Sequence, residues 1–565
     1  MLVYDAVGAA LVDLGVDTVF GVVGSGNFLV TNSLVARGAR FVAARHECGA
    51  ACMADAWARA SGRPGIVTVH QGPGLTNALT GITEAAKSRT PLLVLAADVS
   101  ASAVQSNFRI DVAALVNGTG ATAAVLHSAS LAIDDVVRAY TTAAEQRRTV
   151  VLAMPLDVQA AECTWPAGGP ARPASAPPVP LQDRQLGALA GALATAQRPV
   201  FVAGRGARVA RAGQALERLA GECGALLATS AAAKGLFRGS PWDLDVSGGF
   251  ASPLAAELIS GADVLVAWGC SLGMWTTRHG SLIGRGATVA QVDVDKAAIG
   301  AHRRVDIGVV GDAGQVANVL VELLSAQADG HPGAAGPEGH GDGARPVGYR
   351  SEELRDRLAR EARWRDVAYD DNGDAEHIDP RTLTIALDDM LPAERTVVVD
   401  SGNFMGYPSM FLSVPDQDGF CFTQAYQSIG LGLASAIGAA LARPDRLTIA
   451  TLGDGGALMG ISELETAVRL GLPMVIVVYN DQAYGAEVHH FGPLGHPLDT
   501  VQFPATDIAA IATGFGCTGV TVRKADDLGP VRDWLAGPRT SPILVDAKVT
   551  AERGAWWLEE AFRGH

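Results

Sequence analysis

The stretch that decides the fold is RLTIATLGDGGALMGISELETAVRLGLPMVIVVYNDQAYG, which runs from Arg446 to Gly485. Its pattern predicts a strand, a glycine turn, a helix and a second strand. Asp454 ends the first strand, and the pair Asn480 and Asp481 ends the second, 26 and 27 positions later. Because a right-handed crossover makes two such strands neighbours, their carboxyl ends should meet at one edge of a parallel sheet.

This edge has the composition of a metal and phosphate site. Asp454 is expected to face Asn480 or Asp481 across the width of one small ion. Mg²⁺ favours one or two carboxylates together with carbonyl, water or phosphate oxygens. Gly455 and Gly456 let backbone N–H groups approach a phosphate, and the start of the following helix adds a favourable dipole. A Gly-Asp-Gly turn alone would also fit an ordinary doubly wound fold, so the specific signal is the turn together with the strand-terminal pair.

The rest of the chain repeats this alternation of strands and helices in three blocks. Pro-, Gly- and Ala-rich stretches at 166–180 and 329–348 read as linkers, because they cannot bury a core. They leave an N-terminal domain at 1–165, a central domain at 181–328 and a C-terminal domain at 349–565. Strands such as GIVTVH, VFVAG and PMVIVVYND are continuous apolar runs, which are typical of strands covered on both faces. The predicted fold class is therefore α/β, with three doubly wound domains and mainly parallel sheets.

Composition narrows the class of protein. The chain has 565 residues and a formal net charge of −15, which argues against nonspecific nucleic-acid binding because that needs basic surface. No apolar run reaches the length of a membrane span, and acidic residues interrupt the apolar N-terminus, which argues against a signal peptide. The seven cysteines are dispersed and form no CxxC motif, so we expect a reduced, cytoplasmic protein.

The Gly-Asp-Gly turn and the pair that follows it resemble the cofactor signature of thiamine-diphosphate-dependent enzymes. The surrounding sequence is similar to the branch that holds acetolactate synthase, pyruvate oxidase, benzoylformate decarboxylase and the 2-hydroxyacyl-CoA lyases, and the similarity covers almost the whole chain. It implies a pyrimidine-binding N-terminal domain, a central domain and a diphosphate-binding C-terminal domain, with thiamine diphosphate and Mg²⁺ as cofactors. In that family the metal takes positions that match Asp454, Asp481 and the carbonyl of Ala483. Asp481 replaces the usual Asn, Asn480 stays an alternative ligand, and Tyr484 is counted with the cofactor-binding residues.

The resemblance also assigns an activator and three further cofactor contacts. Glu47, in ARHECGAA after a predicted strand, matches the glutamate that hydrogen-bonds the aminopyrimidine of the cofactor and promotes formation of its carbon nucleophile. From the residues alone, Glu47 would be an ordinary carboxylate at a helix start. Ile429 matches the bulky residue that props the cofactor into its bent shape, and Gly402 and Asn403, in DSGNFMG, match contacts to the diphosphate.

Several residues near predicted strand ends are candidates for substrate contact. Ser25 in GVVGSGN, and His70 and Gln71 in VTVHQGPG, match places where decarboxylases of the benzoylformate type keep active-site Ser and His residues. A lone histidine is more often structural, and the catalytic interpretation of His70 rests on its position beside a glycine turn. Glu487 follows the metal motif in YGAEVHHFGP, either as an active-site group or as part of a solvated helix face. Acetolactate synthases carry a Trp where this chain has His490, which puts acetolactate synthesis in doubt.

The central domain and the C-terminus give weaker signals. VFVAGRGA offers only Gly204 and Gly206 after a strand, without the third glycine and the acidic residue of a dinucleotide fingerprint, so FAD is not expected. The resemblance implies a homodimer or homotetramer with the active site at the subunit interface. The C-terminal GAWWLEEAFRGH predicts an amphipathic helix in which Trp556 and Trp557 either cover the active site or only pack.

Together, these residues and the resemblance predict a non-oxidative 2-keto acid decarboxylase or carboligase, dependent on thiamine diphosphate and Mg²⁺. Its partner would be a small 2-keto acid or a related carbonyl compound. Acetolactate synthase proper and a 2-hydroxyacyl-CoA lyase are the alternatives among enzymes. A cofactor-binding relative without activity is the alternative outside them, and the presence of both Glu47 and Asp454 argues against it.

Overall fold

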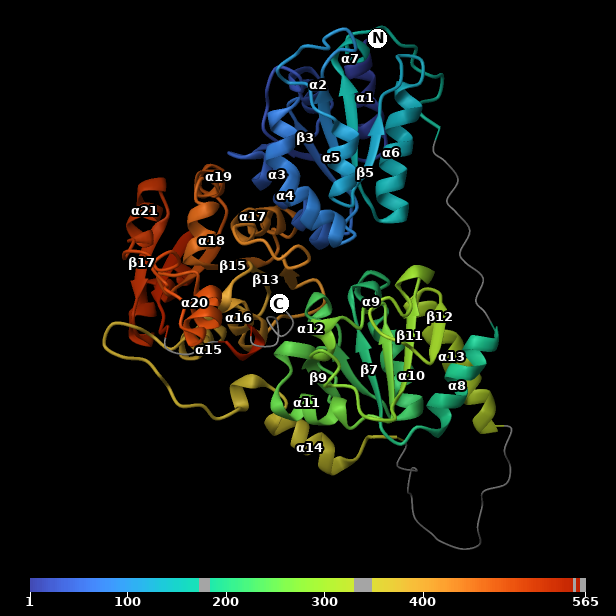
Figure 1. Ribbon diagram of the computed structural model, residues 1–565, viewed down its shortest axis with the longest axis vertical. Coiled ribbons are helices and arrows are strands. Elements are labelled where there is room, and N and C mark those ends of the chain that lie inside the picture. The colour runs from blue at the N-terminus through green and yellow to red at the C-terminus, as the bar shows by residue number, and fades with distance from the viewer. Residues whose placement is uncertain (172–182, 330–347, 552–554, 559–565) are drawn as a thin grey trace, which may run out of the picture.

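A computed structural model describes residues 1–171, 183–329, 348–551 and 555–558, and these residues form three α/β domains (Figure 1). Each domain holds a six-stranded sheet, and every strand pair within the sheets is parallel. This confirms the predicted fold class. Most of the two predicted linkers, residues 172–182 and 330–347, lies outside the described residues.

The N-terminal domain lies at the top of Figure 1, and its strand order is β2-β1-β3-β4-β6-β5. Its strands are β1 (Thr18–Gly21), β2 (Arg40–Ala43), β3 (Gly65–Val69), β4 (Leu92–Asp98), β5 (Thr122–Val125) and β6 (Thr149–Pro155). Its helices are α1 (Val3–Asp13), α2 (Phe28–Ala36), α3 (Glu47–Ser61), α4 (Pro73–Lys87), α5 (Val112–Gly118), α6 (Ala132–Gln146) and α7 (Leu156–Gln159). All of β3 is buried, as a continuous apolar run requires when helices cover both faces of a sheet.

The central domain has a different strand order, β12-β11-β10-β7-β8-β9. Its strands are β7 (Pro199–Ala203), β8 (Leu226–Thr229), β9 (Asp243–Val246), β10 (Val264–Trp268), β11 (Thr288–Asp293) and β12 (Ile307–Val310). Its helices are α8 (Asp183–Thr195), α9 (Arg205–Val209), α10 (Gly213–Cys223), α11 (Pro253–Ser260), α12 (Met274–Thr277) and α13 (Ala313–Asp329). This is the order of a dinucleotide-binding doubly wound sheet, with its switch point between β7 and β10.

The C-terminal domain repeats the order of the first, as β14-β13-β15-β16-β18-β17. Its strands are β13 (Arg395–Val399), β14 (Phe420–Phe422), β15 (Leu447–Gly453), β16 (Met474–Asn480), β17 (Thr518–Val522) and β18 (Ile543–Lys548). Its helices are α15 (Pro380–Met390), α16 (Gly406–Phe411), α17 (Gly432–Ala442), α18 (Asp454–Met459), α19 (Glu463–Arg469), α20 (Gly485–Phe491), α21 (Ile508–Phe515) and α22 (Gly529–Ala536). Strand order reverses between β13 and β15, which is where doubly wound sheets bind their ligands.

The first and third domains share one hydrophobic core. Helices α3 and α17 are rich in small residues, and their buried side chains belong to the same apolar cluster. A Cβ at Gly438 of α17 would lie only 2.0 Å from the carbonyl oxygen of Met53 in α3, so the close approach of the two helices requires glycine there. This packing fixes the N-terminal domain against the C-terminal one within a single chain.

Helix α14 (Glu352–Glu361) follows the second low-complexity stretch but lies against the central domain (Figure 1). Leu358 and Ala362 pack in one apolar cluster with Leu254 and Leu258 of α11. Arg357 of α14 donates two hydrogen bonds, of 2.9 and 2.8 Å, to the carboxylate of Glu257 on α11. Across the described parts of the chain, no helix combines the length and the apolar character needed to span a bilayer.

Candidate active site

The predicted metal residues lie together at the carboxyl ends of β15 and β16, next to the switch point of the C-terminal sheet. Asp454 follows β15 as the first residue of α18, where the helix dipole favours a negative charge. Asp481 follows β16, which pairs with β15 in parallel register. Asp454 is only 8 % exposed, Asp481 is half-buried, and the two carboxyl groups lie close enough to interact. Neighbouring strands thus bring together two acidic groups far apart in the chain, as the spacing predicts.

Electrostatics make this pair unfavourable without a counter-ion. Burial raises the pKa of Asp454 to about 6. Burial and the neighbouring charge of Asp454 raise the pKa of Asp481 to about 7. Two neighbouring carboxylates that are partly withdrawn from water resist full ionisation, and a divalent cation between them would remove that cost. Within the described residues, no group of three or more His, Cys, Asp or Glu side chains could hold a metal. A metal at this pair would therefore take its other ligands from other oxygens, such as those of the backbone, amide side chains, water or phosphate.

The backbone after β16 turns the two members of the Asn-Asp pair in different directions. Gln482 has a left-handed φ of 57°, and the N–H of Ala483 donates to the carboxylate of Asp481. The Asn480 side chain is buried and donates to Oδ1 of Asp546 at 2.7 Å, while its own oxygen accepts from the Gln482 N–H at 3.2 Å. Both polar ends of the Asn480 amide are thus engaged inside the domain, and Asp481 is the member that meets Asp454.

The glycine turn beside the pair is closely packed and has no space for larger side chains at Gly455 and Gly456. A Cβ at Gly455 would lie 2.6 Å from the ring of Tyr484, and one at Gly456 would lie 2.6 Å from Oδ2 of Asp400. Gly402 has a φ of 139°, which favours glycine, and precedes Asn403 at the end of β13. The Asn403 amide lies against Asp481, and its buried oxygen has no hydrogen-bond partner. A closely packed glycine turn, an unmatched amide and an unneutralised carboxylate pair fit a diphosphate–metal group.

Ile429 lies in the loop that leads into α17, and this loop is held by a buried carboxylate. Asp400, at the end of β13, accepts hydrogen bonds from the N–H groups of Gly430 at 2.9 Å and Leu431 at 3.2 Å. Burial raises the pKa of Asp400 to about 6. The Ile429 side chain itself is half-buried. Sequence reasoning missed Asp400, although a lone aspartate at a strand end next to the Gly402 turn was a usable signal.

Glu47 stands at the start of α3, beside the C-terminal edge of the N-terminal sheet. The preceding residue, His46, has extended backbone, and its side chain accepts a hydrogen bond from the Cys48 N–H, which caps the helix. The Glu47 carboxylate is half-buried and accepts one hydrogen bond at Oε2, from the amide of Asn77 at 3.0 Å. Asn77 lies in α4 and was also missed, because nothing in the sequence marks which polar residue of α4 faces α3.

Ser25, His70 and Gln71 come together at the same edge of this sheet, at its switch point between β1 and β3. The N–H of Gly26 donates to Nδ1 of His70 at 3.2 Å, and a Cβ at Gly26 would lie 1.7 Å from Oε1 of Gln71. The Ser25 side chain is exposed beside them. The His70 ring packs edge-on against Phe108, with ring centroids 5.2 Å apart. The structure thus groups the three predicted residues and adds Phe108.

Glu487 lies in the first turn of α20, four residues after Ala483. Its side chain is half-buried, so it is neither a core residue nor a fully solvated one. Burial lowers the pKa of His489 on the same helix. The His490 ring lies against Phe491, with centroids 4.6 Å apart.

Three sequence families match the chain in the order of its domains. They are the thiamine pyrophosphate enzyme N-terminal TPP-binding domain over residues 1–124, the central domain over 186–320 and the C-terminal TPP-binding domain over 400–547. A probable 2-ketoarginine decarboxylase from Pseudomonas aeruginosa is 31% identical over 548 residues, which cover 93% of this chain and 90% of the relative.

The chain belongs to the thiamine pyrophosphate enzyme family. Thiamine pyrophosphate is another name for thiamine diphosphate, so the predicted family and cofactor are confirmed, and with them an enzyme that acts on carbon–carbon bonds next to a carbonyl. Other relatives are a catabolic acetolactate synthase from Raoultella terrigena, 28% identical, and a sulfoacetaldehyde acetyltransferase from Castellaniella defragrans, 27% identical. The alignments cover 94% and 91% of this chain, and 93% and 87% of those relatives.

In this thiamine pyrophosphate enzyme, the two glycines of the central motif have a structural explanation. A Cβ at Gly204 would lie 2.5 Å from the carbonyl oxygen of Gly269, and one at Gly206 would lie 2.6 Å from the Gly269 Cα. The loops after β7 and β10 therefore approach each other closely at the switch point of the central sheet. Burial, together with nearby arginines that include Arg147, lowers the pKa of Arg205 to about 10.

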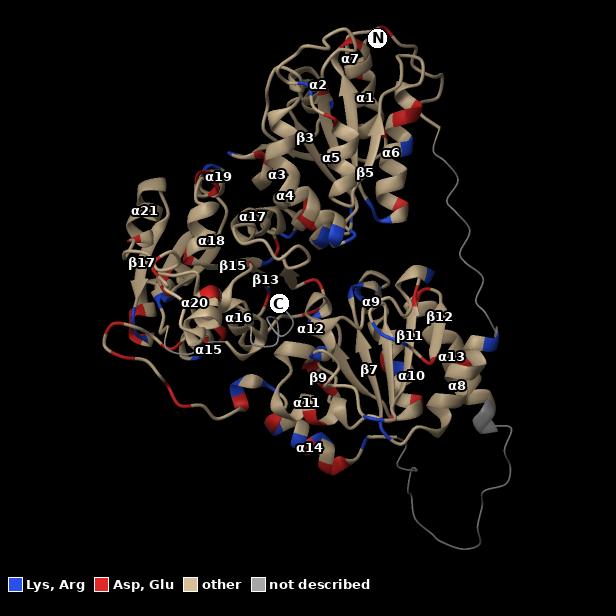
Figure 2. Cartoon of the chain, in the orientation of Figure 1, with Lys and Arg blue, Asp and Glu red and all other residues tan. Residues whose placement is uncertain are grey.

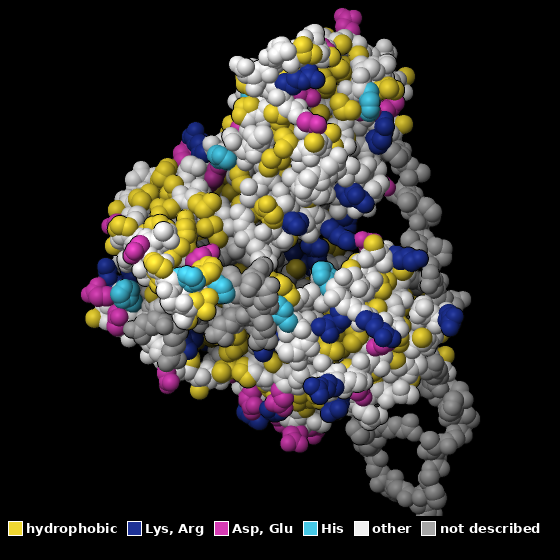
Figure 3. All heavy atoms as spheres, viewed as in Figure 1, with side chains coloured by type: hydrophobic (Ala, Val, Ile, Leu, Met, Phe, Trp, Pro, Cys, Tyr) yellow, Lys and Arg dark blue, Asp and Glu magenta, His cyan; other side chains and the backbone are white. Residues whose placement is uncertain are grey.

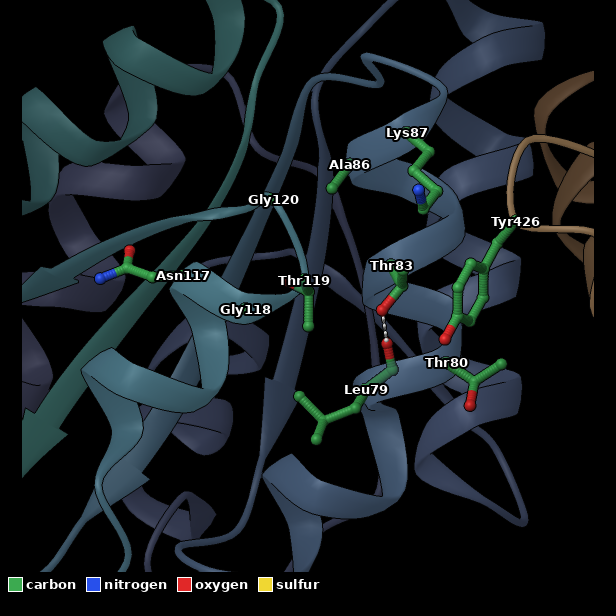
Figure 4. Close-up of a pocket in the computed structure, with 10 residues that line it drawn as sticks. All are labelled: Leu79, Thr80, Thr83, Ala86, Lys87, Asn117, Gly118, Thr119, Gly120 and Tyr426. Atoms are coloured by element: carbon green, nitrogen blue, oxygen red, sulfur yellow. Dashed lines mark hydrogen bonds between the residues drawn. The ribbon is translucent and has the colours of Figure 1, made fainter.

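Charge is unevenly spread over the enzyme. Acidic and basic side chains alternate over the outer helices (Figure 2), whereas Lys and Arg side chains gather in the hollow where the three domains meet (Figure 3). A cavity of about 640 Å³ opens between α4, the loop after α5 and Tyr426 of the C-terminal domain (Figure 4). Its only charged lining residue is Lys87, and none of the predicted site residues lines it. The candidate site is therefore built at strand ends and not in this cavity.

The described part of the C-terminal tail packs inside the enzyme. Trp557 is fully buried, its ring lies edge-on to Tyr407 with centroids 5.0 Å apart, and its N–H donates to the carbonyl of Asn403 at 3.2 Å. Trp556 donates to the carbonyl of Gly249 in the central domain at 3.3 Å. Of the two alternatives, packing is the role these residues have here, and Trp557 also supports the backbone of a predicted diphosphate contact. The predicted helix beyond residue 558 lies outside the described residues.

Proposed function

We propose that this thiamine-diphosphate-dependent enzyme is a Mg²⁺-dependent, non-oxidative 2-keto acid decarboxylase or carboligase. The observation that carries the proposal is the close pair of Asp454 and Asp481 beside a glycine turn, at the carboxyl ends of the adjacent strands β15 and β16. Mg²⁺ would take one oxygen from each carboxylate and the carbonyl of Ala483. Gly402, Asn403, Gly455, Gly456 and Tyr484 would surround the diphosphate, Ile429 would support the thiazolium ring, and Asn480 would hold the β16 end in place.

Thiamine diphosphate, when bound, supplies a carbon nucleophile and an electron sink for the carbonyl carbon of the substrate. Glu47 would hold and exchange a proton with the aminopyrimidine of this cofactor. Asn77 already donates to Oε2 of Glu47, which leaves Oε1 as the oxygen for that proton. An oriented carboxylate of this kind is what general acid–base catalysis needs.

Ser25 and His70 would contact the substrate. Because Nδ1 of His70 accepts from the Gly26 N–H, the neutral ring carries its proton on Nε2, which can donate to a carbonyl or carboxylate oxygen. Gln71 is buried against Gly26 and would hold the Ser25 loop in place. Glu487, from the start of α20, would approach the same space from the diphosphate side. These roles are consistent with a polar substrate that carries a carboxylate next to its ketone.

A panel of substrates tests the proposal. With thiamine diphosphate and Mg²⁺ present, the purified enzyme should release CO₂ from at least one 2-keto acid among pyruvate, benzoylformate and 2-ketoarginine. The last is included because a relative is named as a probable 2-ketoarginine decarboxylase. Product analysis then separates a free aldehyde from a carboligation product. Absence of CO₂ release from every 2-keto acid would overturn the decarboxylase proposal and leave the enzyme class intact.

Acetyl-group transfer is the second candidate, because relatives are named as an acetolactate synthase and a sulfoacetaldehyde acetyltransferase. Acetolactate from pyruvate, or acetyl phosphate from sulfoacetaldehyde and phosphate, would support it. Cleavage of a 2-hydroxyacyl-CoA would instead support the lyase alternative. The same purified protein can be tested on all of these substrates.

The proposed active site would combine Glu47 of one subunit with Asp454 of another in a homodimer or homotetramer. Co-expression of Glu47→Gln and Asp454→Ala chains that carry different tags tests this directly. A mixed dimer would contain one site with both residues intact, so at limiting cofactor its activity should rise well above the strongly reduced activity of either variant alone. If both residues of one site come from the same chain, the mixed dimer stays as inactive as its parents.

A further inference from the structure

Helix α19 of the C-terminal domain holds the segment that leads into Glu47. Oε1 of Glu463 accepts hydrogen bonds from the N–H groups of Arg45 and His46, both at 3.0 Å. Arg469, at the other end of α19, donates to the carbonyl of Ala43 at 2.5 Å. A helix from another domain thus binds the carbonyl of the last residue of β2 and the backbone N–H groups of the two residues that precede Glu47.

Glu463 is built into this contact from both sides. The residue is 2 % exposed, and Oε2 accepts a hydrogen bond from the Thr466 hydroxyl at 2.7 Å. On the α3 side, Gly49 faces the carboxylate, and a Cβ at this position would lie 2.3 Å from Oε1 of Glu463. Within α3 a glycine costs helix stability relative to alanine, so its presence beside the carboxylate indicates that the space is needed.

We propose that Glu463 is a positioning residue for Glu47: it fixes the start of α3 so that the Glu47 carboxylate stays where its proton exchange is needed. The inference rests on the proposed role of Glu47. Glu463 does not touch Glu47 through its side chain; it acts through the backbone of the two preceding residues. Since a misplacement of about 1 Å can cost roughly 100-fold in rate, a residue that holds the start of α3 in place affects the rate of the reaction.

The same helix supplies a matched control. Glu465 forms an ion pair with the side chain of Arg45, and both partners are partly exposed. This contact joins the same helix to the same residue, but through a side chain and not through the backbone that leads into Glu47. A surface ion pair contributes little to stability, so its loss should leave α3 in place.

The first test compares four variants as complete enzymes with thiamine diphosphate and Mg²⁺. Glu463→Leu removes the acceptor, and Gly49→Ala pushes the carboxylate away while favouring the helix itself; each should lower kcat about 10- to 100-fold. Substrate KM and cofactor affinity should stay unchanged, because the diphosphate site lies elsewhere. Glu463→Gln keeps an oxygen acceptor and should remain within a few-fold of wild type, as should Glu465→Gln. If Glu463→Leu does not fold, Gly49→Ala still decides the matter; wild-type kcat in Gly49→Ala would overturn the proposal.

A double-mutant cycle separates positioning from general stability. If Glu463 acts through Glu47, then Glu463→Leu should lower kcat in the wild-type background and have no further effect in Glu47→Gln. An equal loss in both backgrounds would overturn the proposal. The cycle also separates the two claims: full activity in Glu47→Gln defeats the proposed role of Glu47, whereas a slow Glu47→Gln beside a fast Gly49→Ala defeats only the inference about Glu463.

Amide hydrogen exchange of the cofactor-free protein gives a readout that does not involve activity. The N–H groups of Arg45 and His46 should exchange slowly in wild type and Glu463→Gln, and faster in Glu463→Leu and Gly49→Ala. Glu465→Gln should match wild type. Unchanged exchange of the peptide around residues 44–50 in Gly49→Ala would show that the helix start does not depend on Glu463, and would overturn the proposal.

Discussion

The first and third sheets share one strand order, but they hold their candidate site residues at different places along it. In the C-terminal sheet, Asp454 and Asp481 follow β15 and β16, two adjacent central strands. In the N-terminal sheet, Glu47 follows β2, which is an edge strand. Central strand ends lie between covering helices, so Asp454 is buried, Asp481 is half-buried, and both are held within one domain. The edge position leaves Glu47 half-buried, and a helix of the other domain supports it.

This difference matches the tasks proposed for the two halves. A metal and diphosphate anchor works best when its ligands are fixed before the group arrives, which a pair of central strands provides. A proton-exchanging carboxylate must instead meet a cofactor whose other end is held elsewhere. It therefore lies at an accessible edge, and its precision depends on contacts such as those of Asn77 and Glu463.

The largest expected effect comes from Glu47, at the accessible edge of the N-terminal sheet. Glu47→Gln keeps the shape of the side chain and the hydrogen bond from Asn77, but it cannot exchange a proton. We expect kcat to fall roughly 10²–10⁴-fold, the usual contribution of a general acid–base group. Cofactor affinity, measured by calorimetry, should stay near wild type because the anchor is intact. Equal rates of thiazolium proton exchange into D₂O in both proteins would contradict the proposed role.

Asp454→Ala, at the metal and diphosphate anchor, should weaken cofactor binding more than it lowers kcat at saturation. Loss of one carboxylate leaves the metal with a single acidic side chain, so thiamine diphosphate should bind at least about 100-fold more weakly at fixed Mg²⁺, more than the loss of an outer-shell partner typically costs. Saturating cofactor and metal should restore part of kcat, which they cannot do for Glu47→Gln. Calorimetric titration of the cofactor measures the change, and an unaltered Kd would remove Asp454 from the anchor.

The same contrast explains what the sequence could predict. Asp454 and Asp481 were predictable because each ends an apolar run and the crossover rule brings neighbouring strand ends together. Which member of the Asn-Asp pair faces Asp454 was not, since that depends on the left-handed turn at Gln482 and on the buried partner of Asn480, Asp546. The family resemblance, and not the local pattern, singled out Glu47.

The supports of Glu47 were out of reach for a related reason. Asn77 and Glu463 act by facing α3 from another helix and another domain, and a single sequence does not record which helix faces which. The three parallel sheets, in contrast, follow from apolar runs that each strand carries itself. Local patterns therefore predicted the layers, and tertiary packing decided how the edge residue is held.

A smaller effect should come from the hydrogen bond that orients Glu47. Asn77→Ala removes the donor to Oε2, a charged hydrogen bond worth about 1.5 kcal/mol, so kcat should fall about tenfold. Thr76→Ala, at the adjacent and exposed position of α4, is the control and should leave kcat unchanged. In a Glu47→Gln background the Asn77 substitution should have almost no further effect. A full tenfold loss there would mean that Asn77 acts on something other than Glu47.

The smallest effect is expected at Asp481, and it concerns stability more than rate. Asp481→Asn keeps an oxygen ligand, and the relatives implied by the resemblance carry Asn at this position, so the loaded enzyme should retain most of its activity. In the protein without metal and cofactor, the substitution removes one of two neighbouring carboxylates, and with it their repulsion. The metal-free variant should therefore have a higher Tm than metal-free wild type. Addition of Mg²⁺ and thiamine diphosphate should raise the Tm of wild type by the larger amount, because only wild type has that repulsion to relieve.

Asp499→Asn, an exposed substitution of the same chemistry in the loop after α20, should change neither Tm. A lower metal-free Tm for Asp481→Asn would mean that its carboxylate stabilises the empty site, and the buried anchor would then need no cation to hold its shape.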